Sequence, residues 1–107
     1  MRQSAAKAID KKKPVEHAIV DAIIQRIRPR RILLFGSRAR GDADERSDYD
    51  VAIDCEDLTP RLLAQIRADL ETLPTLREIE VVWLNRIAGT IRQRILDEGK
   101  ILYEQKA

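Results

Sequence analysis

The stretch from Leu34 to Asp54 constrains this chain most, because it fixes where one strand stops and where the next begins. The apolar run Arg31–Phe35 is typical of a short buried strand, and Gly36-Ser37 breaks it. Glycine permits unusual backbone dihedrals, and a helix that starts at a serine offers outward-pointing N–H groups to a phosphate. Taken alone, a strand followed by Gly-Ser also fits an ordinary turn.

Residues 48–54 alternate with the two-residue period of a β-strand. One face carries Tyr49, Val51 and Ile53, and the other carries Asp48, Asp50, Ala52 and Asp54. Two carboxylates so close on one face repel each other unless a cation lies between them. Mg²⁺ commonly takes one or two carboxylates together with substrate phosphates. Asp48 and Asp50 are therefore candidate metal ligands, and Asp54 is interpreted as a strand-end or turn residue.

Three amphipathic stretches predict helices around these strands. They are Val15–Arg28 between Pro14 and Pro29, the segment from Pro60 to Leu73-Pro74, and Ile87–Glu98 before Gly99. Their apolar faces are formed by Val15, Ile19, Ile23 and Ile27; by Leu62, Leu63, Ile66 and Leu70; and by Ile87, Ile91 and Ile95. Residues 79–84 (IEVVWL) predict a third strand, and residues 100–103 a short last one.

This alternation of helices and strands predicts an α/β (α+β) fold with one small mixed sheet flanked by helices. The link from Phe35 to Asp48 is about a dozen residues, so the strands that it joins are expected to be antiparallel neighbours. A length of 107 residues allows one domain. Residues 14–107 are assigned to it, and Met1–Lys13 to a flexible basic N-terminal segment.

Glu80 is the only acid within the predicted strand 79–84. If that strand lies beside the strand that carries Asp50, Glu80 completes a cluster of three carboxylates, which with a triphosphate can hold two metal ions. Glu80 or Asp50 would then accept the proton of an attacking hydroxyl. The plainer alternative is a single outward-facing acid on a half-buried strand.

Composition limits the class of protein. Charged residues make up 36% of the chain, yet the formal net charge of +2 is too small to argue for a nucleic-acid partner. Basic residues recur from Arg26 to Arg46, either as a solvated face or as a positive rim around a phosphate site. The lone Cys55 and the lone His17 exclude a disulfide framework and argue against zinc. With no membrane-length apolar run and no secretory signal, a cytoplasmic location is expected.

Gly36-Ser37, ten further residues, Asp48-x-Asp50 and an acid on a later strand form a pattern more specific than any of its parts. This pattern resembles the signature of the polymerase-β nucleotidyltransferase superfamily. The short chain and its ending, RQRILDEGKILYE, resemble the minimal nucleotidyltransferase branch. The resemblance extends from about Val15 to Glu104 and implies a polymerase-β-like palm, a nucleoside triphosphate substrate such as ATP, and two Mg²⁺ ions.

The resemblance also implies roles for individual residues. Binding of the nucleotide would fall to Gly36, Ser37, Arg38, Arg40 and Ser47, and catalysis and metal ligation to Asp48, Asp50 and Glu80. For the two arginines and Ser47, the alternative is an ordinary surface position. Glu80 stands where the family usually has a third aspartate, and because glutamate is one methylene longer, this departure bears directly on activity.

Members of the minimal branch are commonly encoded beside a small helical HEPN protein, so the resemblance implies a toxin–antitoxin pair. The nucleotidyltransferase is the antitoxin there, and it neutralises a ribonuclease toxin by transferring AMP to it, by binding it, or by both. The expected reaction is AMP transfer from ATP to a hydroxyl of the partner protein. Two alternatives stay open: a binding antitoxin with little or no turnover, and nucleotidyl transfer to a small molecule or RNA. Oligomeric state is also left open.

Overall fold

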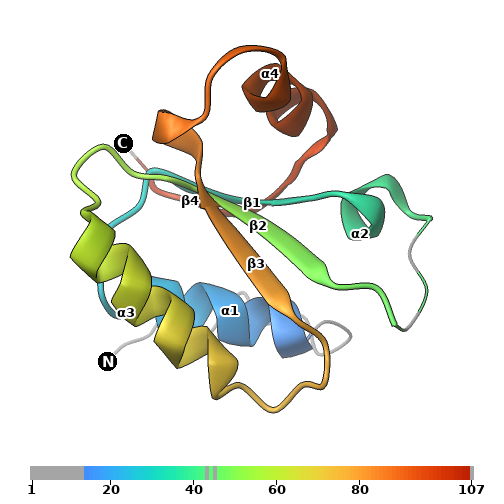
Figure 1. The fold of residues 1–107 in the computed structure, drawn as a ribbon, viewed down its shortest axis with the longest axis horizontal. Coiled ribbons are helices and arrows are strands. Elements are labelled where there is room, and N and C mark those ends of the chain that lie inside the picture. The colour runs from blue at the N-terminus through green and yellow to red at the C-terminus, as the bar shows by residue number, and fades with distance from the viewer. Residues whose placement is uncertain (1–13, 43, 45, 107) are drawn as a thin grey trace.

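Four strands form a single sheet in the order β3–β2–β1–β4 (Figure 1). The computed structural model describes residues 14–42, 44 and 46–106, so the predicted N-terminal segment Met1–Lys13 lies outside the described residues. The strands are β1 (Arg31–Phe35), β2 (Tyr49–Asp54), β3 (Ile79–Trp83) and β4 (Lys100–Glu104). The helices are α1 (Pro14–Ile24), α2 (Ser37–Arg40), α3 (Pro60–Glu71) and α4 (Gly89–Glu98), with a 3-10 turn, η2 (Leu84–Arg86), before α4.

The strand pairing confirms the mixed sheet predicted from the sequence. β1 runs antiparallel to β2 and to β4, while β2 and β3 run parallel. Phe35 on β1 is in register with Asp50 on β2, which is in register with Glu80 on β3. Because residues in register project to the same face, these three side chains form one row across the sheet, where β1 ends and where β2 and β3 begin.

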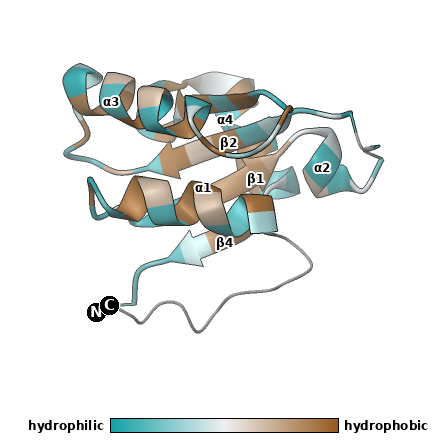
Figure 2. Ribbon diagram, turned by 90° about the horizontal axis from the view of Figure 1, so that it is seen from below, coloured by the Kyte–Doolittle hydropathy of each residue, from teal (hydrophilic) through white to brown (hydrophobic). Residues whose placement is uncertain are grey.

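The two faces of the sheet are covered unequally. One face packs against α1 and α3 through the main core, which includes Ile19, Ile23, Ile32, Leu34, Val51, Ile53, Leu63, Ile66 and Val81. On the opposite face α4 covers a smaller cluster formed by Leu33, Ala52, Leu84 and Ile95. Figures 1 and 2 show α1 and α3 on one side of the sheet and α4 on the other. On the face that α4 covers in part, Glu80 is exposed and Asp50 is half-buried.

The helix α3 agrees with the sequence prediction. It begins at Pro60, and the Oγ1 atom of Thr59 caps it by accepting a hydrogen bond from the Leu62 N–H at 3.1 Å. Of the four inward-facing residues that the spacing predicts, Leu63, Ile66 and Leu70 are buried and Leu62 is partly buried. Among the described residues, no helix has the length and apolarity needed to cross a membrane.

Two helix boundaries differ from the prediction. The helix α1 ends at Ile24 instead of Arg28, and a turn follows in which the Ile27 N–H still donates to the Ile23 carbonyl. The Arg26 N–H donates to the same Ile23 carbonyl at 3.1 Å, and this tighter three-residue step ends the regular helix before Pro29 is reached. The helix α4 begins at Gly89, since Ile87 closes the η2 turn by donating to the Leu84 carbonyl.

The predicted core face of α4 is also partly wrong. Ile95 is buried as expected, and Ile87 packs at the edge of the smaller cluster. Ile91, however, is 63% exposed. The helix α4 covers only part of this face of the sheet. Ile91 therefore lies beyond the residues that pack in the smaller cluster.

Candidate active site

Gly36 joins β1 to α2 in a conformation that glycine adopts readily and other residues do not. Its φ is 75° and its ψ is −157°, and its carbonyl accepts hydrogen bonds from the amides of Ala39 and Arg40, both at 3.1 Å. A Cβ atom built at this position would overlap Oδ2 of Asp50. The Gly-Ser loop therefore lies directly against the Asp50 carboxylate, so the structure brings these two sequence-predicted features together.

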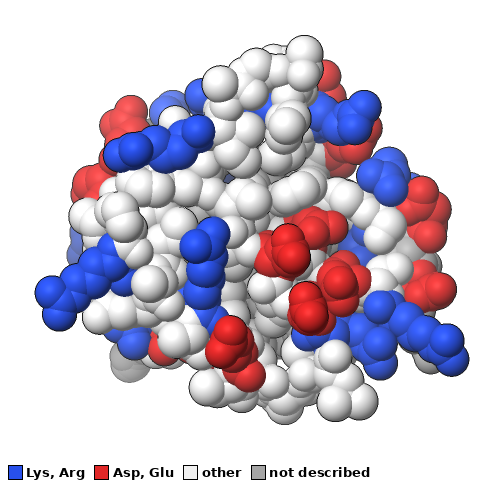
Figure 3. All heavy atoms as spheres, in the orientation of Figure 1, with Lys and Arg blue, Asp and Glu red and all other residues white. Residues whose placement is uncertain are grey.

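The other two predicted carboxylates lie near Asp50. Glu80 is its neighbour on the parallel strand β3, and Asp48 comes just before β2. Burial raises the pKa of Asp50, the negative charges of Glu80 and Asp48 raise it further, and the positive charge of Arg40 opposes them. Figure 3 shows a group of acidic side chains near the middle of the surface turned toward the viewer, with basic side chains to its right.

The chemistry of these donors fits magnesium. Mg²⁺ is bound through carboxylate oxygens and substrate phosphates, and a divalent cation relieves the repulsion that raises the pKa of Asp50. Across residues 14–42, 44 and 46–106, however, no three acidic, histidine or cysteine side chains converge as a ready metal cage. Oδ1 of Asp48 accepts a hydrogen bond from the Glu78 N–H at 3.2 Å.

Ser37 and Arg40 lie beside Gly36. Ser37 begins α2, and the first amides of any helix have no partner within that helix. Arg40 places its Nε atom 3.3 Å from Oδ2 of Asp42 and its Nη1 atom 3.7 Å from Oε1 of Glu98. Arg40 is close enough for its charge to lower the pKa of Asp50, and the role of Ser37 and Arg40 in binding phosphates stays a prediction.

Arg38 and Ser47 are held in a different contact. The Nε and Nη2 atoms of Arg38 donate to the Ser47 carbonyl at 3.0 and 2.8 Å, and its guanidinium lies 4.0 Å from the centroid of the Tyr49 ring. The Ser47 hydroxyl accepts a hydrogen bond from the Asp44 N–H at 3.1 Å. Because Tyr49 packs on the α1 and α3 side, Arg38 lies away from Arg40 and fastens α2 to the start of β2.

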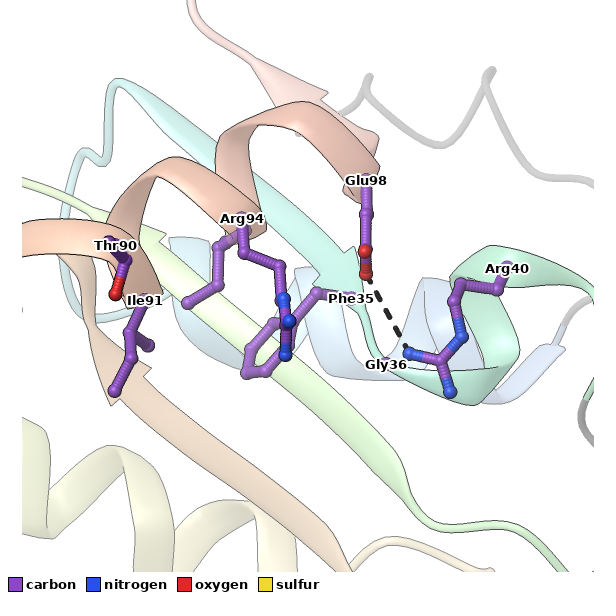
Figure 4. A pocket seen from close by; sticks show the side chains of 8 residues that line it. Phe35, Gly36, Arg40, Thr90, Ile91, Arg94 and Glu98 are labelled. Atoms are coloured by element: carbon purple, nitrogen blue, oxygen red, sulfur yellow. Dashed lines mark ion pairs between the residues drawn. The ribbon is translucent and has the colours of Figure 1, made fainter.

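A cleft of about 460 Å³ opens between α4 and the Gly-Ser loop. Its lining consists of Phe35, Gly36, Arg40, Thr90, Ile91, Arg94, Ile95 and Glu98 (Figure 4). Of these residues, the sequence pattern identified Gly36 and Arg40 but not Arg94, and it assigned Ile91 to the core. The spacing of Ile87, Ile91 and Ile95 is the same for a residue that faces the core and for one that faces a cleft, so the pattern held no signal that separates the two.

Asp54 belongs to a structural clamp at the other end of β2. Its buried carboxylate accepts hydrogen bonds from Arg31 at 3.0 and 2.9 Å and from Nδ2 of Asn85 at 3.1 Å. Asn85 also accepts from the Cys55 N–H at 2.8 Å, and the Trp83 indole donates to the Cys55 carbonyl at 3.1 Å. The sequence prediction that Asp54 is a strand-end residue is confirmed, and the clamp fixes the η2 turn that leads into α4.

The sequence that forms this site matches a known protein family. Residues 17–107 match the family described as Polymerase beta, Nucleotidyltransferase. A Methanocaldococcus jannaschii protein named "putative protein adenylyltransferase" is 34% identical over 83 residues, which cover 71% of this chain and 80% of that protein.

Two solved structures share the fold. A chain in the crystal structure of a toxin–antitoxin with AMP-PNP has a TM-score of 0.64 at 23% identity, over 85% of this chain and 74% of that one. A chain in the structure of a tri-AMPylated Shewanella oneidensis HEPN toxin with MNT antitoxin has a TM-score of 0.67 at 20% identity, over 87% and 72%. The family match spans the sheet, the Gly-Ser loop and all three carboxylates, and this chain belongs to the polymerase-β nucleotidyltransferase family.

Proposed function

We propose that this protein transfers AMP from ATP to a hydroxyl of a partner protein of the HEPN toxin type and acts as the antitoxin of that pair. The observation that carries the proposal is the contact of the Gly36 backbone with the Asp50 carboxylate, next to Glu80 on β3. The name of the M. jannaschii relative supports protein adenylylation. The AMP-PNP complex and the AMPylated HEPN toxin among the structural neighbours support the nucleotide and the type of partner.

Two groups of residues would have separate roles in this site, one binding phosphates and the other binding metal. Gly36 and Ser37 would hold the triphosphate through the backbone of the loop, with Arg40 beside them as a positive charge. Asp48, Asp50 and Glu80 would hold Mg²⁺, which supplies Lewis-acid stabilisation of charge on the phosphate oxygens. Because these residues position charge and do little covalent chemistry, geometry and electrostatics are the main sources of rate acceleration.

The chemical step is a substitution at the α-phosphorus of ATP. The acceptor hydroxyl oxygen forms a bond to the α-phosphorus, the bond to the oxygen that bridges the α- and β-phosphates breaks, and pyrophosphate leaves with that electron pair. The hydroxyl proton passes to a carboxylate. Asp50 is one candidate for this task, because its carboxylate lies against the Gly-Ser loop that would hold the phosphates, and Glu80, its neighbour on β3, is the other.

Labelled ATP tests the proposed reaction. The protein, Mg²⁺ and a HEPN-type protein from the same genome are incubated with ATP labelled at either the α- or the γ-phosphate. Nucleotidyl transfer predicts that the partner acquires the α-label and never the γ-label, and that Asp50→Asn reduces the rate about 10²- to 10⁴-fold. Transfer of the γ-label would identify a kinase reaction and reject the proposal.

A second candidate is a binding antitoxin with little turnover. It is favoured by Glu80, which is longer than the usual aspartate, and by the lack of a closed three-ligand cage among the described residues. The double variant Asp48→Asn/Asp50→Asn separates the two functions. A pure binder would neutralise its partner as well with these substitutions as without them, whereas a transferase would lose neutralisation together with label transfer.

A further inference from the structure

The two ends of the cleft under α4 are lined by different kinds of side chain. Figure 4 shows Gly36, Arg40 and Glu98 at one end, Phe35 and Arg94 in the middle, and Thr90 and Ile91 at the other end. The ion pair between Arg40 and Glu98 bridges α2 and α4 at the first end. From Thr90 to Glu98 the helix rises about 12 Å. The cleft therefore extends well beyond the Gly-Ser loop where the proposed function places the triphosphate.

The middle of the cleft has an apolar floor. Phe35 lies in the same row of the sheet as Asp50 and Glu80, and Ile95 is the buried residue on the inner side of α4. Ile91 contributes a large aliphatic side chain that is 63% exposed. A volume of about 460 Å³ falls in the range of sites that bind small organic molecules. Such a floor suits a flat, weakly polar group more than it suits further phosphates.

Arg94 projects into this apolar section. Figure 4 shows its side chain pointing into the part of the cleft that Phe35 also lines. Within the part of the chain that the structure describes, Arg94 makes no hydrogen bond or ion pair, in contrast to Arg40 in the same cleft. A planar cation on an apolar surface, with no carboxylate to neutralise it, is a suitable stacking partner for an aromatic ring.

We propose that this cleft binds the nucleoside half of the substrate, with the base on the surface of Phe35 and Ile91 and stacked against the Arg94 guanidinium. The inference rests on the proposed function, because binding of the triphosphate at Gly36 directs the nucleoside into the cleft. Stacking on a guanidinium tolerates different bases, so Arg94 and Ile91 are expected to strengthen the binding of nucleotides in general. The sequence pattern gave Arg94 no role and assigned Ile91 to the core.

Calorimetric titrations test the inference through binding, without need of AMP transfer. The ligands are AMP-PNP and inorganic tripolyphosphate, each with Mg²⁺, because the second lacks a base and a sugar. Arg94→Ala is expected to weaken AMP-PNP binding about 3- to 30-fold and to leave tripolyphosphate binding within about twofold. Ile91→Ala is expected to act in the same direction. Arg92→Ala on the same helix and Ile101→Ala on β4 are matched controls outside the cleft and are expected to bind both ligands normally.

Each outcome of these titrations decides the inference. Equal weakening of both ligands by Arg94→Ala would make Arg94 a phosphate contact and overturn the inference. Unchanged binding in both cleft variants, or no AMP-PNP binding by the wild type, would overturn it as well. If the loss is selective for AMP-PNP but the wild type transfers no α-label to a partner, the nucleoside site stands and the proposed function fails.

Discussion

At the scale of single residues, the closest fit in this site is that of Gly36 against Asp50. Two separate constraints act on Gly36, namely its positive φ and the absence of room for a Cβ atom. Gly41 shares the first constraint, with a φ of 87°, but a Cβ built there would meet nothing within 4 Å. Gly41 therefore shows what a positive φ alone costs in this loop.

Substituting these two glycines tests whether the contact matters for function. Gly41→Ala is expected to lower the free energy of unfolding by about 1–2 kcal/mol and to keep most of the activity, because only the dihedral is strained. Gly36→Ala carries a larger strain, because its ψ of −157° lies in a region essentially restricted to glycine, and it also displaces Asp50. A displacement of about 1 Å costs about 100-fold in rate. The measurements are chemical denaturation and AMP transfer. Equal activity in the two variants would show that the position of Asp50 next to the loop is unimportant.

Asp50 is expected to destabilise the metal-free protein. Its pKa is raised in the folded state, so between the ordinary carboxyl pKa and the raised value the folded protein binds more protons than the unfolded chain. The free energy of unfolding therefore falls as the pH rises through that window. Without metal, Asp50→Asn should raise Tm by a few degrees at neutral pH, and this gain should vanish at low pH.

Thermal melts between pH 3 and 8 measure this effect, with the exposed Asp21→Asn on α1 as the control. Mg²⁺ should raise Tm of the wild type more than that of Asp50→Asn, because the cation relieves the same repulsion. An Asp50→Asn protein that melts below the wild type at neutral pH without metal would contradict this account of the carboxylate cluster.

Cys55 is predicted to be chemically inert in the folded protein. It is 2% exposed, its thiol donates to Oδ1 of Asp57 at 3.3 Å, and burial together with Asp57 raises its pKa to about 11. At pH 8 only about 0.1% of such a thiol is thiolate, so alkylation by iodoacetamide should be at least about 100-fold slower than in urea-unfolded protein. Comparable rates in the two states would show that the end of β2 opens readily.

At the scale of elements, the position of α4 is what shapes the cleft. The chain leaves β3 through η2, and Asn85 in that turn joins the buried Asp54 carboxylate to the Cys55 N–H. The amide of one side chain thus satisfies an acceptor and a donor that the fold keeps away from water. This clamp lies at the far end of β2 from Asp50 and sets where α4 begins.

Removing the clamp should therefore be costly to stability. Asn85→Ala leaves the Asp54 carboxylate and the Cys55 N–H each short of a buried partner, which should lower the free energy of unfolding by about 1–3 kcal/mol. Gln93→Ala is the control, because it removes an exposed hydrogen bond of 2.8 Å to Asp97 and should cost less than about 0.5 kcal/mol. Urea denaturation compares the two variants. A similar loss of unfolding free energy in both would mean that the buried hydrogen bonds of Asn85 add no more stability than an exposed one.

At the scale of the whole molecule, unequal covering of the sheet turns one face into a site. The helices α1 and α3 cover one face, whereas α4 covers only part of the other, where Asp50 and Glu80 lie. Two-residue periodicity predicted this sidedness, because alternation in β2 places Tyr49, Val51 and Ile53 opposite Asp50 without any knowledge of the fold. The antiparallel pairing of β1 and β2 also followed from the sequence, since the link between them is short.

The features that escaped prediction depend on contacts between elements. Arg38 and Arg40 are two residues apart on one short helix and so point to different sides, but only the fold shows that Arg38 contacts the Ser47 carbonyl and the Tyr49 ring. Ile91 follows the same spacing as the buried Ile95, and its exposure results from how little of the sheet α4 covers. Local periodicity determines the direction of a side chain relative to its own element, but not what lies opposite to it.

The intact mass of the partner is the most direct test of the central claim, that Gly36, Asp50 and Glu80 form a working site for AMP transfer. A HEPN-type protein from the same genome is incubated with this chain, ATP and Mg²⁺, and its mass is compared with that from a reaction with Asp50→Asn. The account predicts that the partner gains whole AMP units with the wild-type chain, and at least about 100-fold more slowly with the variant. A stable complex whose partner keeps its original mass, and whose neutralisation survives Asp50→Asn, would contradict it.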